Sequence, residues 1–120
     1  MTRQSKVGQL GEDIAERYLK KKHYKIVERN YREKWGEIDI IAISKKVLVF
    51  VEVKTVSGPN PSITAEDQLT RAKLSKLQRT AELYANGPGV GRVKRGGWRI
   101  DLLSITIEGD NATVKHYQNI

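Results

Sequence analysis

Apolar residues recur at helical spacing in two stretches of the chain. In residues 7–22 charged residues fill the positions between them, and the apolar stripe consists of Val7, Leu10, Ile14, Ala15, Tyr18 and Leu19. A second helix is predicted from an N-cap at Thr64, with Asp67 at the capping-box position, to about Asn86, where glycine and proline follow. The pattern therefore predicts two helices that each bury one face.

Between and after these helices the apolar residues form shorter, β-branched runs. Such runs favour strands, and we predict five, at residues 24–32, 37–44, 47–55, 98–107 and 113–117. Glycine and proline in residues 56–62 and 87–97 predict loops. The order is α-β-β-β-α-β-β, without an internal repeat, and residues 1–120 are predicted to form a single α/β domain.

Two lysines separate the second and third predicted strands, which favours a hairpin. If Ser44 faces Val47, then Asp39 lies directly opposite Glu52, with Cβ atoms about 5 Å apart. The same register brings Lys54 to the end of the hairpin where these two carboxylates lie.

Alternation along the hairpin predicts which side chains share a face. One face is predicted to hold Glu37, Asp39, Ile41, Ile43, Leu48, Phe50, Glu52 and Lys54, and the other Ile38, Ile40, Val49, Val51 and Val53. Both faces are largely apolar, so both are expected to be covered. Ionisable groups are thus gathered at one end of a mostly buried hairpin.

Two neighbouring carboxylates in such a place repel each other and lose hydration unless a cation or a proton neutralises them. A hard divalent ion, Mg²⁺ or Mn²⁺, bound by Asp39 and Glu52 would meet this need and keep positions for water and phosphate. Lys54 would then orient the water or stabilise charge on phosphoryl oxygens. The alternative is a structural ion-pair cluster in which Lys54 pairs with Glu37 or Glu52.

Composition narrows the kind of partner and metal. Lys and Arg number 22 against 14 Asp and Glu, and the net charge of +8 favours a polyanion such as nucleic acid, although basic surfaces also serve solubility or anionic membranes. Without cysteine and with two histidines, the chain is expected to bind metal through oxygen. The longest aliphatic and aromatic run, residues 47–51, is too short to span a bilayer, and we predict a cytoplasmic protein without a membrane partner.

The second helix carries two lysines within its apolar stripe. Lys73 and Lys76 lie in line with Leu69 and Thr80 at helical spacing. They are predicted to reach toward the carboxylates of the hairpin and bind phosphates, or else to extend their ammonium groups into solvent along their aliphatic stems.

The spacing of Asp39 and Glu52-Val-Lys54 resembles the D…E-x-K core of the PD-(D/E)xK nucleases. Further segments resemble the YraN family of small bacterial nuclease-like proteins: Gly8–Glu12 with Ala15, Arg29–Arg32, Gly36–Ala42, Val49–Thr55 and Arg99–Asp101. This resemblance covers nearly the whole chain. It implies a restriction-endonuclease-like fold, with a central mixed sheet flanked by helices, and a relation to Holliday junction resolvases.

The resemblance also implies further site residues. Glu12 matches a first-helix glutamate that completes the acidic, metal-binding site, with Glu16 in reserve; the alternative for such an acid is interaction with the helix dipole. Arg32 and Arg99 match phosphate contacts, although each suits a solvated position or an internal partner for a carboxylate equally well. Ile38 precedes Asp39, so the literal Pro-Asp pair is absent.

Three aromatic residues, Tyr31, Trp35 and Trp98, are candidates for stacking on bases, although packing is the commoner use of such side chains. The expected function is Mg²⁺-dependent hydrolysis of DNA at branched or single-stranded structures, and analogy favours a homodimer. The rivals are a non-catalytic nucleic-acid-binding module with the same fold and a basic assembly protein that binds RNA.

Overall fold

The computed structural model describes residues 5–57, 69–87 and 97–120. Its elements are α1 (Lys6–Lys21), β1 (Lys25–Glu33), β2 (Gly36–Ser44), β3 (Val47–Ser57), α2 (Arg71–Ala85), β4 (Trp98–Glu108) and β5 (Asn111–Tyr117). The predicted α/β class and element order are confirmed. Of the two predicted loops, residues 56 and 57 belong to β3, while 58–62 and most of 87–97 lie outside the described residues.

The five strands form one mixed sheet in the order β1-β2-β3-β4-β5. Neighbouring strands pair antiparallel except β3 and β4, which are parallel. A parallel pair requires a connection that crosses from one end of the sheet to the other, and α2 lies within that connection. The central position of β3 follows from its pairing with β2 on one side and β4 on the other.

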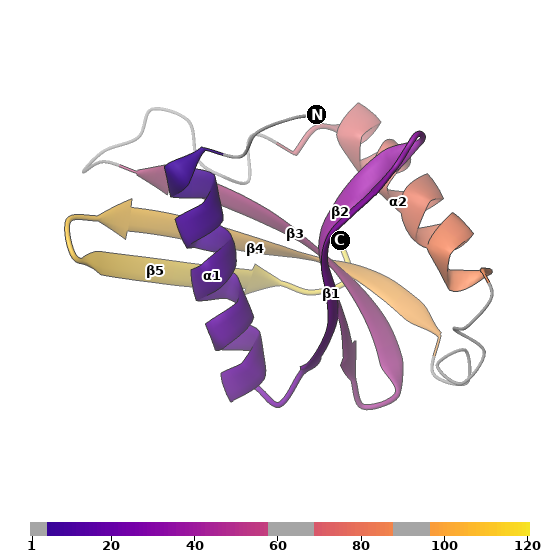
Figure 1. Cartoon of the computed structure of the whole chain (residues 1–120), viewed down its shortest axis with the longest axis horizontal. Helices are drawn as coiled ribbons and strands as arrows, with labels where there is room; N and C mark the ends of the chain where they lie inside the picture. The colour runs from indigo at the N-terminus through magenta and orange to yellow at the C-terminus, as the bar shows by residue number, and fades with distance from the viewer. Residues whose placement is uncertain (1–4, 58–68, 88–96) are drawn as a thin grey trace.

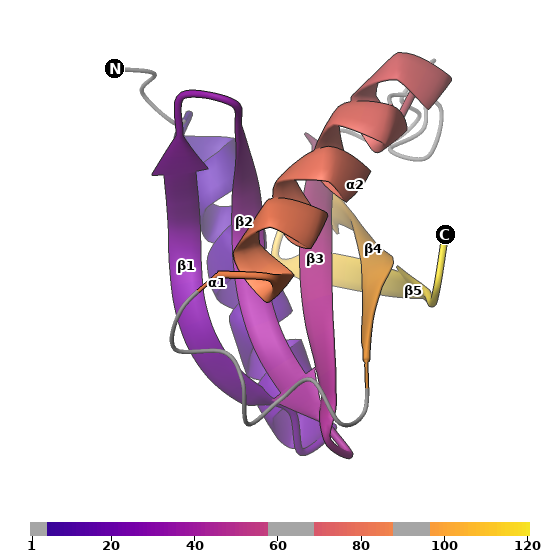
Figure 2. The same ribbon diagram turned by 90° about the vertical axis from the view of Figure 1, so that its right-hand side faces the viewer.

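The two helices cover opposite faces of the sheet (Figures 1 and 2). One core cluster packs below α1 and includes Ala15 and Leu19 of the helix with Val49, Val51 and Leu103 of the sheet. A second cluster packs below α2 and is built from these residues: Ile38, Ile41, Leu48, Phe50, Leu77, Ala81, Ala85 and Ile100. The strands of the hairpin are therefore buried on both sides, as their apolar composition predicts.

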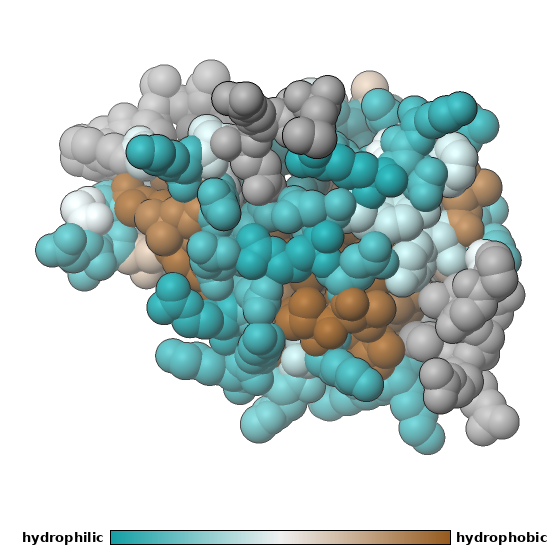
Figure 3. All heavy atoms as spheres, in the orientation of Figure 1, coloured by the Kyte–Doolittle hydropathy of each residue, from teal (hydrophilic) through white to brown (hydrophobic). Residues whose placement is uncertain are grey.

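The buried face of α1 differs from the predicted stripe. Gly11, Glu12, Ala15 and Leu19 are buried, whereas the side chains at positions 7 and 10 are 39% and 44% exposed. The Gly11 backbone approaches β3 so closely that a Cβ there would overlap the Thr55 side chain. On this side of the molecule, hydrophobic residues reach the surface in patches separated by hydrophilic ones (Figure 3).

The second helix begins later than predicted. Thr70 is its N-cap, and the Thr70 hydroxyl accepts a hydrogen bond from the Lys73 N–H at 3.2 Å. Residues 69 and 70 are not helical, so a helix running unbroken from residue 65 is wrong; Thr64 and Asp67 lie outside the described residues. No helix among the described residues is long and apolar enough to cross a membrane.

A close contact between Gly36 and Thr80 fixes α2 against the start of β2. Thr80 is fully buried, and its hydroxyl donates a hydrogen bond to the Lys76 carbonyl at 2.9 Å. A Cβ at position 36 would overlap the Thr80 hydroxyl. The contact therefore fixes the distance between β2 and the helical turn that carries Lys76.

Gly36→Ala is expected to destabilise the fold by about 1–3 kcal/mol, because the added methyl group has no room at this contact. Urea unfolding of Gly36→Ala, Thr80→Ala and the double variant would measure the coupling between the two positions. Removing the Thr80 side chain should relieve part of the loss, so the double variant should lose less than the sum of the single variants. Strictly additive losses would contradict this role for the contact.

Candidate active site

Asp39 lies where the pairing between β2 and β3 ends. The predicted register is correct from the turn as far as Ile40, which pairs with Val51. Beyond this pair the Asp39 carboxylate accepts the hydrogen bond of the Val53 N–H at 2.8 Å. The predicted backbone pairing of Asp39 with Glu52 is therefore wrong, because the Asp39 side chain takes up a strand N–H at this point.

The same irregularity changes the face on which Ile38 lies. Alternation places Ile38 with Ile40, but Ile38 packs below α2 with Ile41, and Ile40 packs below α1. On the neighbouring strand β1, Asn30 has a left-handed φ of 53° beside this segment. Alternation alone does not predict such a break in the backbone.

Asp39 and Glu52 form a pair of neighbouring carboxyl groups. Burial, together with a hydrogen bond to Glu52 and the charge of Glu52, raises the pKa of Asp39 from 3.8 to about 8, although the Val53 N–H and Lys54 act in the opposite direction. The Lys54 ammonium lies 3.9 Å from a Glu52 carboxylate oxygen. At neutral pH the pair therefore retains a proton or requires a cation.

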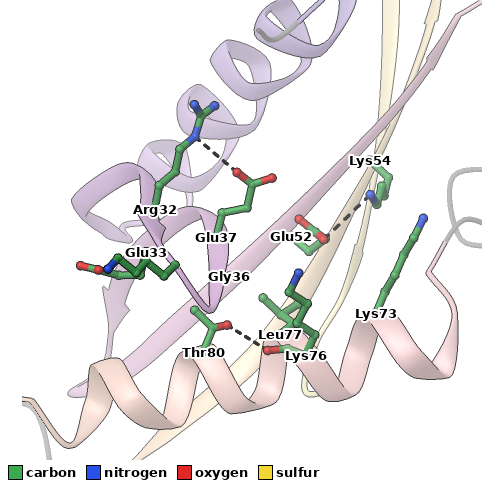
Figure 4. Close-up of a pocket in the computed structure, with 11 residues that line it drawn as sticks. Arg32, Glu33, Gly36, Glu37, Glu52, Lys54, Lys73, Lys76, Leu77 and Thr80 are labelled. Carbon is green, nitrogen blue, oxygen red and sulfur yellow. Dashed lines mark hydrogen bonds and ion pairs between the residues drawn. The ribbon is translucent and has the colours of Figure 1, made fainter. Parts of the chain in front are cut away.

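A pocket of about 490 Å³ opens beside Glu52 and Lys54 (Figure 4). Its lining carries five cationic side chains against three carboxylates, namely Arg32, Lys34, Lys54, Lys73 and Lys76 against Glu33, Glu37 and Glu52. Lys73 extends from α2 toward the side of the pocket where Lys54 lies. Lys73 and Lys76 thus line the same pocket as Glu37 and Glu52 of the hairpin, and both are exposed.

Of the two arginines singled out in the sequence, one reaches the pocket. Arg32 lines it, and its Nε lies 3.3 Å from Glu37. Arg99 lies elsewhere, where its guanidinium donates hydrogen bonds to Asp101 at 3.0 Å and to the Tyr24 hydroxyl at 2.9 Å. The structure thus places Arg99 as an internal partner of a carboxylate, the alternative left open by the sequence.

Glu12 is buried on α1, where Arg29 binds it. The Arg29 guanidinium lies 3.4 Å from Glu12, 2.9 Å from Asp13 and 3.2 Å from Glu16. Glu16 also pairs with Lys20 at 2.7 Å. Among the described residues no three acidic or histidine side chains lie close enough together to hold a metal ion. The metal-binding set of Glu12, Asp39 and Glu52 is thus not among the groups that the described residues form, and Glu12 is paired with Arg29.

Two polar centres, one partly buried and one fully buried, were missed in the sequence. Arg29 is the first, and its signal is the group of acids at positions 12, 13 and 16, which one helix brings to one side. Asp101 is the second. It is fully buried and accepts hydrogen bonds from Arg99, from His116 Nε2 at 2.7 Å and from the Asn119 N–H at 3.0 Å. The spacing of Arg99 and Asp101, two apart on one strand, is the signal for this pair.

Proteins of similar sequence match this chain over nearly its full length. Residues 11–105 match the profile of "Uncharacterised protein family UPF0102". A "UPF0102 protein" of Fervidobacterium nodosum is 38% identical over 112 residues, which cover 93% of this chain and 79% of the relative. Relatives of the same name from Thermotoga petrophila and Syntrophotalea carbinolica are 38% and 37% identical, covering 91% and 92% of this chain and 91% and 87% of their own lengths.

Proposed function

The chain belongs to the UPF0102 family, the YraN family, and we propose that it is a metal-dependent nuclease that hydrolyses phosphodiester bonds of DNA in the cytoplasm. The observation that carries this proposal is the Asp39–Glu52 carboxyl pair beside a mainly cationic pocket. The names of the relatives state no activity, so the proposal depends on the chemistry of the site.

The carboxyl pair fits a hard divalent cation. Two acids held together in a buried place are stabilised by positive charge, and Mg²⁺ or Mn²⁺ accepts one or two carboxylates as protein ligands. Asp39 and Glu52 would hold the ion. When bound, it would supply Lewis-acid polarisation of a phosphate and a water of lowered pKa.

The cationic residues of the pocket supply the binding of phosphate. Lys54, beside Glu52, would stabilise negative charge on the phosphoryl oxygens of the scissile group. Lys73 and Lys76 would hold neighbouring phosphates from α2, and Arg32 would do so from β1. The net charge of +8 would speed the approach of the polyanion.

One observation favours a second candidate, a nucleic-acid-binding module without catalytic activity. Among the described residues Asp39 and Glu52 come together without Glu12, which is bound by Arg29. Such a module would keep the salt-dependent affinity for DNA and lack cleavage.

Analogy with enzymes that cut branched DNA symmetrically further leads us to propose a homodimer, since such cleavage requires two sites.

The test is the cleavage of labelled branched, single-stranded and duplex DNA with Mg²⁺, with Mn²⁺ or with EDTA. We expect products with either metal and none with EDTA. Lys54→Ala should lower the rate about 100-fold, because the site loses a charged donor aimed at the reacting phosphate. Lys115→Ala, which removes the same charge from an exposed position on β5, is the matched control and should leave the rate unchanged.

Cleavage that is equally fast with Lys54→Ala would identify a contaminating nuclease. Binding of DNA without cleavage under any metal would establish the binding module instead. The nuclease proposal therefore requires both the metal dependence and the loss on Lys54→Ala.

A further inference from the structure

The three aromatic residues considered for base stacking occupy different surroundings. Tyr31 packs edge-on against Tyr84, with ring centroids 5.0 Å apart, and Trp98 packs against Phe50 at 5.7 Å. Within the described part of the chain, Trp35 takes part in no aromatic pair, and it is 42% exposed. Trp98 is itself 38% exposed, so Trp35 differs from it in its neighbours rather than in exposure: the Trp35 indole is exposed without an aromatic partner among the described residues.

Trp35 lies at the tip of the β1–β2 hairpin, between two residues that line the pocket. Glu33 and Gly36 are the last paired residues of the two strands, so Lys34 and Trp35 form the turn. Lys34 and Gly36, on either side of Trp35, both line the pocket. The contact between Gly36 and Thr80 holds this end of the hairpin against α2. The backbone that carries the exposed indole is thus held between two residues that line a cationic pocket.

An exposed aromatic plane next to clustered cations is the combination that binds unpaired nucleotides. The cations contact phosphates, and a base stacks on the ring whatever its sequence, because every base has a π-face. In duplex DNA the flat faces of the bases are covered by their neighbours, so a ring at a hairpin tip reaches a base only where the stack is interrupted.

We propose that Trp35 stacks on an unpaired base of the nucleic acid whose phosphates lie in the pocket, and so selects single-stranded or branched substrates over continuous duplex. This inference rests on the proposed function to the extent that the pocket binds nucleic acid, and it does not require cleavage. The acids and lysines of the pocket contact phosphates and do not distinguish unpaired from paired bases, whereas a base stacked on Trp35 would do so.

The chain has two tryptophans, so each can be observed alone by fluorescence. In Trp98→Phe the emission comes from Trp35, and in Trp35→Phe it comes from Trp98. The titrants are a short oligothymidylate, inorganic polyphosphate of equal charge and a closed-ended hairpin duplex, all in EDTA so that no cleavage occurs. We expect oligothymidylate to quench Trp98→Phe and to leave Trp35→Phe unquenched, while polyphosphate and the closed duplex quench neither.

Affinity for oligothymidylate gives a second readout. Trp35→Ala should weaken binding about tenfold, and Trp35→Tyr, which keeps a ring, should restore most of it. Leu83→Ala, which shortens an exposed apolar side chain on α2, is the control and should bind as the unmodified protein does.

Several outcomes would overturn the inference. Equal quenching by polyphosphate would show that charge alone perturbs the indole, and equal quenching by the closed duplex would remove the selectivity for unpaired bases. Unchanged affinity in Trp35→Ala would exclude stacking, and a loss of self-association in that variant would assign the indole to a protein contact. Quenching without cleavage would leave the inference standing and refute the nuclease, whereas cleavage without quenching would do the reverse.

Discussion

Asp39→Asn is expected to lower metal-dependent cleavage by about 1,000-fold while making the fold more stable at pH 8. The loss of activity follows because the site would lose one of two carboxylates that hold the cation, and bound metal contributes several kcal/mol to the stabilisation of transition-state charge. The gain in stability follows because asparagine removes the charge that is buried beside Glu52. Opposite changes in activity and stability would distinguish this residue from one that only supports the fold.

The raised pKa of Asp39 fixes the direction in which the free energy of unfolding changes with pH. The pKa of Asp39 is about 8 in the folded protein and 3.8 in an ordinary environment, so between these values the folded state binds more protons than the unfolded state. The free energy of unfolding should then fall as the pH rises from about 4 to about 8. Asparagine keeps an amide oxygen for the Val53 N–H and does not titrate, so this part of the pH dependence should disappear.

Urea unfolding in EDTA at pH 5 and pH 8 measures this difference. The variant should be more stable than the unmodified protein at both pH values, and its advantage should be clearly larger at pH 8 than at pH 5. Asp110→Asn, in the exposed β4–β5 turn, is the matched control and should leave the pH dependence unchanged. A variant that is less stable at both pH values would show that the Asp39 charge supports the fold.

Asp101→Ala is expected to cost about 3–5 kcal/mol of stability, the largest loss for any substitution considered. Asp101 is fully buried on β4 and accepts hydrogen bonds from Arg99, His116 and the Asn119 N–H. Burial alone would raise its pKa, but these donors outweigh burial and lower it. Removing the carboxylate would leave the Arg99 charge and two further donors without their acceptor.

Asp101 and Asp39 affect the free energy of unfolding in different ranges of pH. A depressed pKa means that the stabilisation by Asp101 is present above 3.8 and is lost as the pH falls through its folded pKa. Asp101→Ala should therefore be destabilised at both pH 5 and pH 8 in urea unfolding. Asp110→Ala, in an exposed turn, is the control. A loss below about 1 kcal/mol would mean that solvent replaces the carboxylate easily.

Much of the hairpin could be predicted from the sequence because its turn is short. Lys45 and Lys46 both have positive φ, 50° and 69°, as a two-residue turn of type I′ requires. The turn fixes the register up to Ile40, and the apolar alternation agrees with it. The prediction fails at Asp39, where a side chain rather than the backbone accepts the next hydrogen bond, an event that leaves no trace in hydrophobic periodicity.

The buried face of α1 was harder to predict because polar and small residues occupy it. Gly11 is buried to let the helix approach Thr55, and Glu12 is buried through its ion pair with Arg29. Both partners come from other elements, so the helical pattern by itself favours Leu10 instead. The α2 lysines were predictable, because a charge inside an apolar stripe needs a polar destination, and the pocket provides one.

The turn between β2 and β3 also bears on the order in which the site assembles during folding. Closing a short loop costs less chain entropy than closing a long one, so this hairpin is expected to form before α2, far later in the chain, docks on Gly36. Asp39 and Glu52 would then meet early, while Lys73 and Lys76 arrive with the helix. The two carboxyl groups, which repel each other, would thus come together first, and the α2 lysines would join them last. The pocket would therefore form only when the long-range contacts of α2 with the sheet are made.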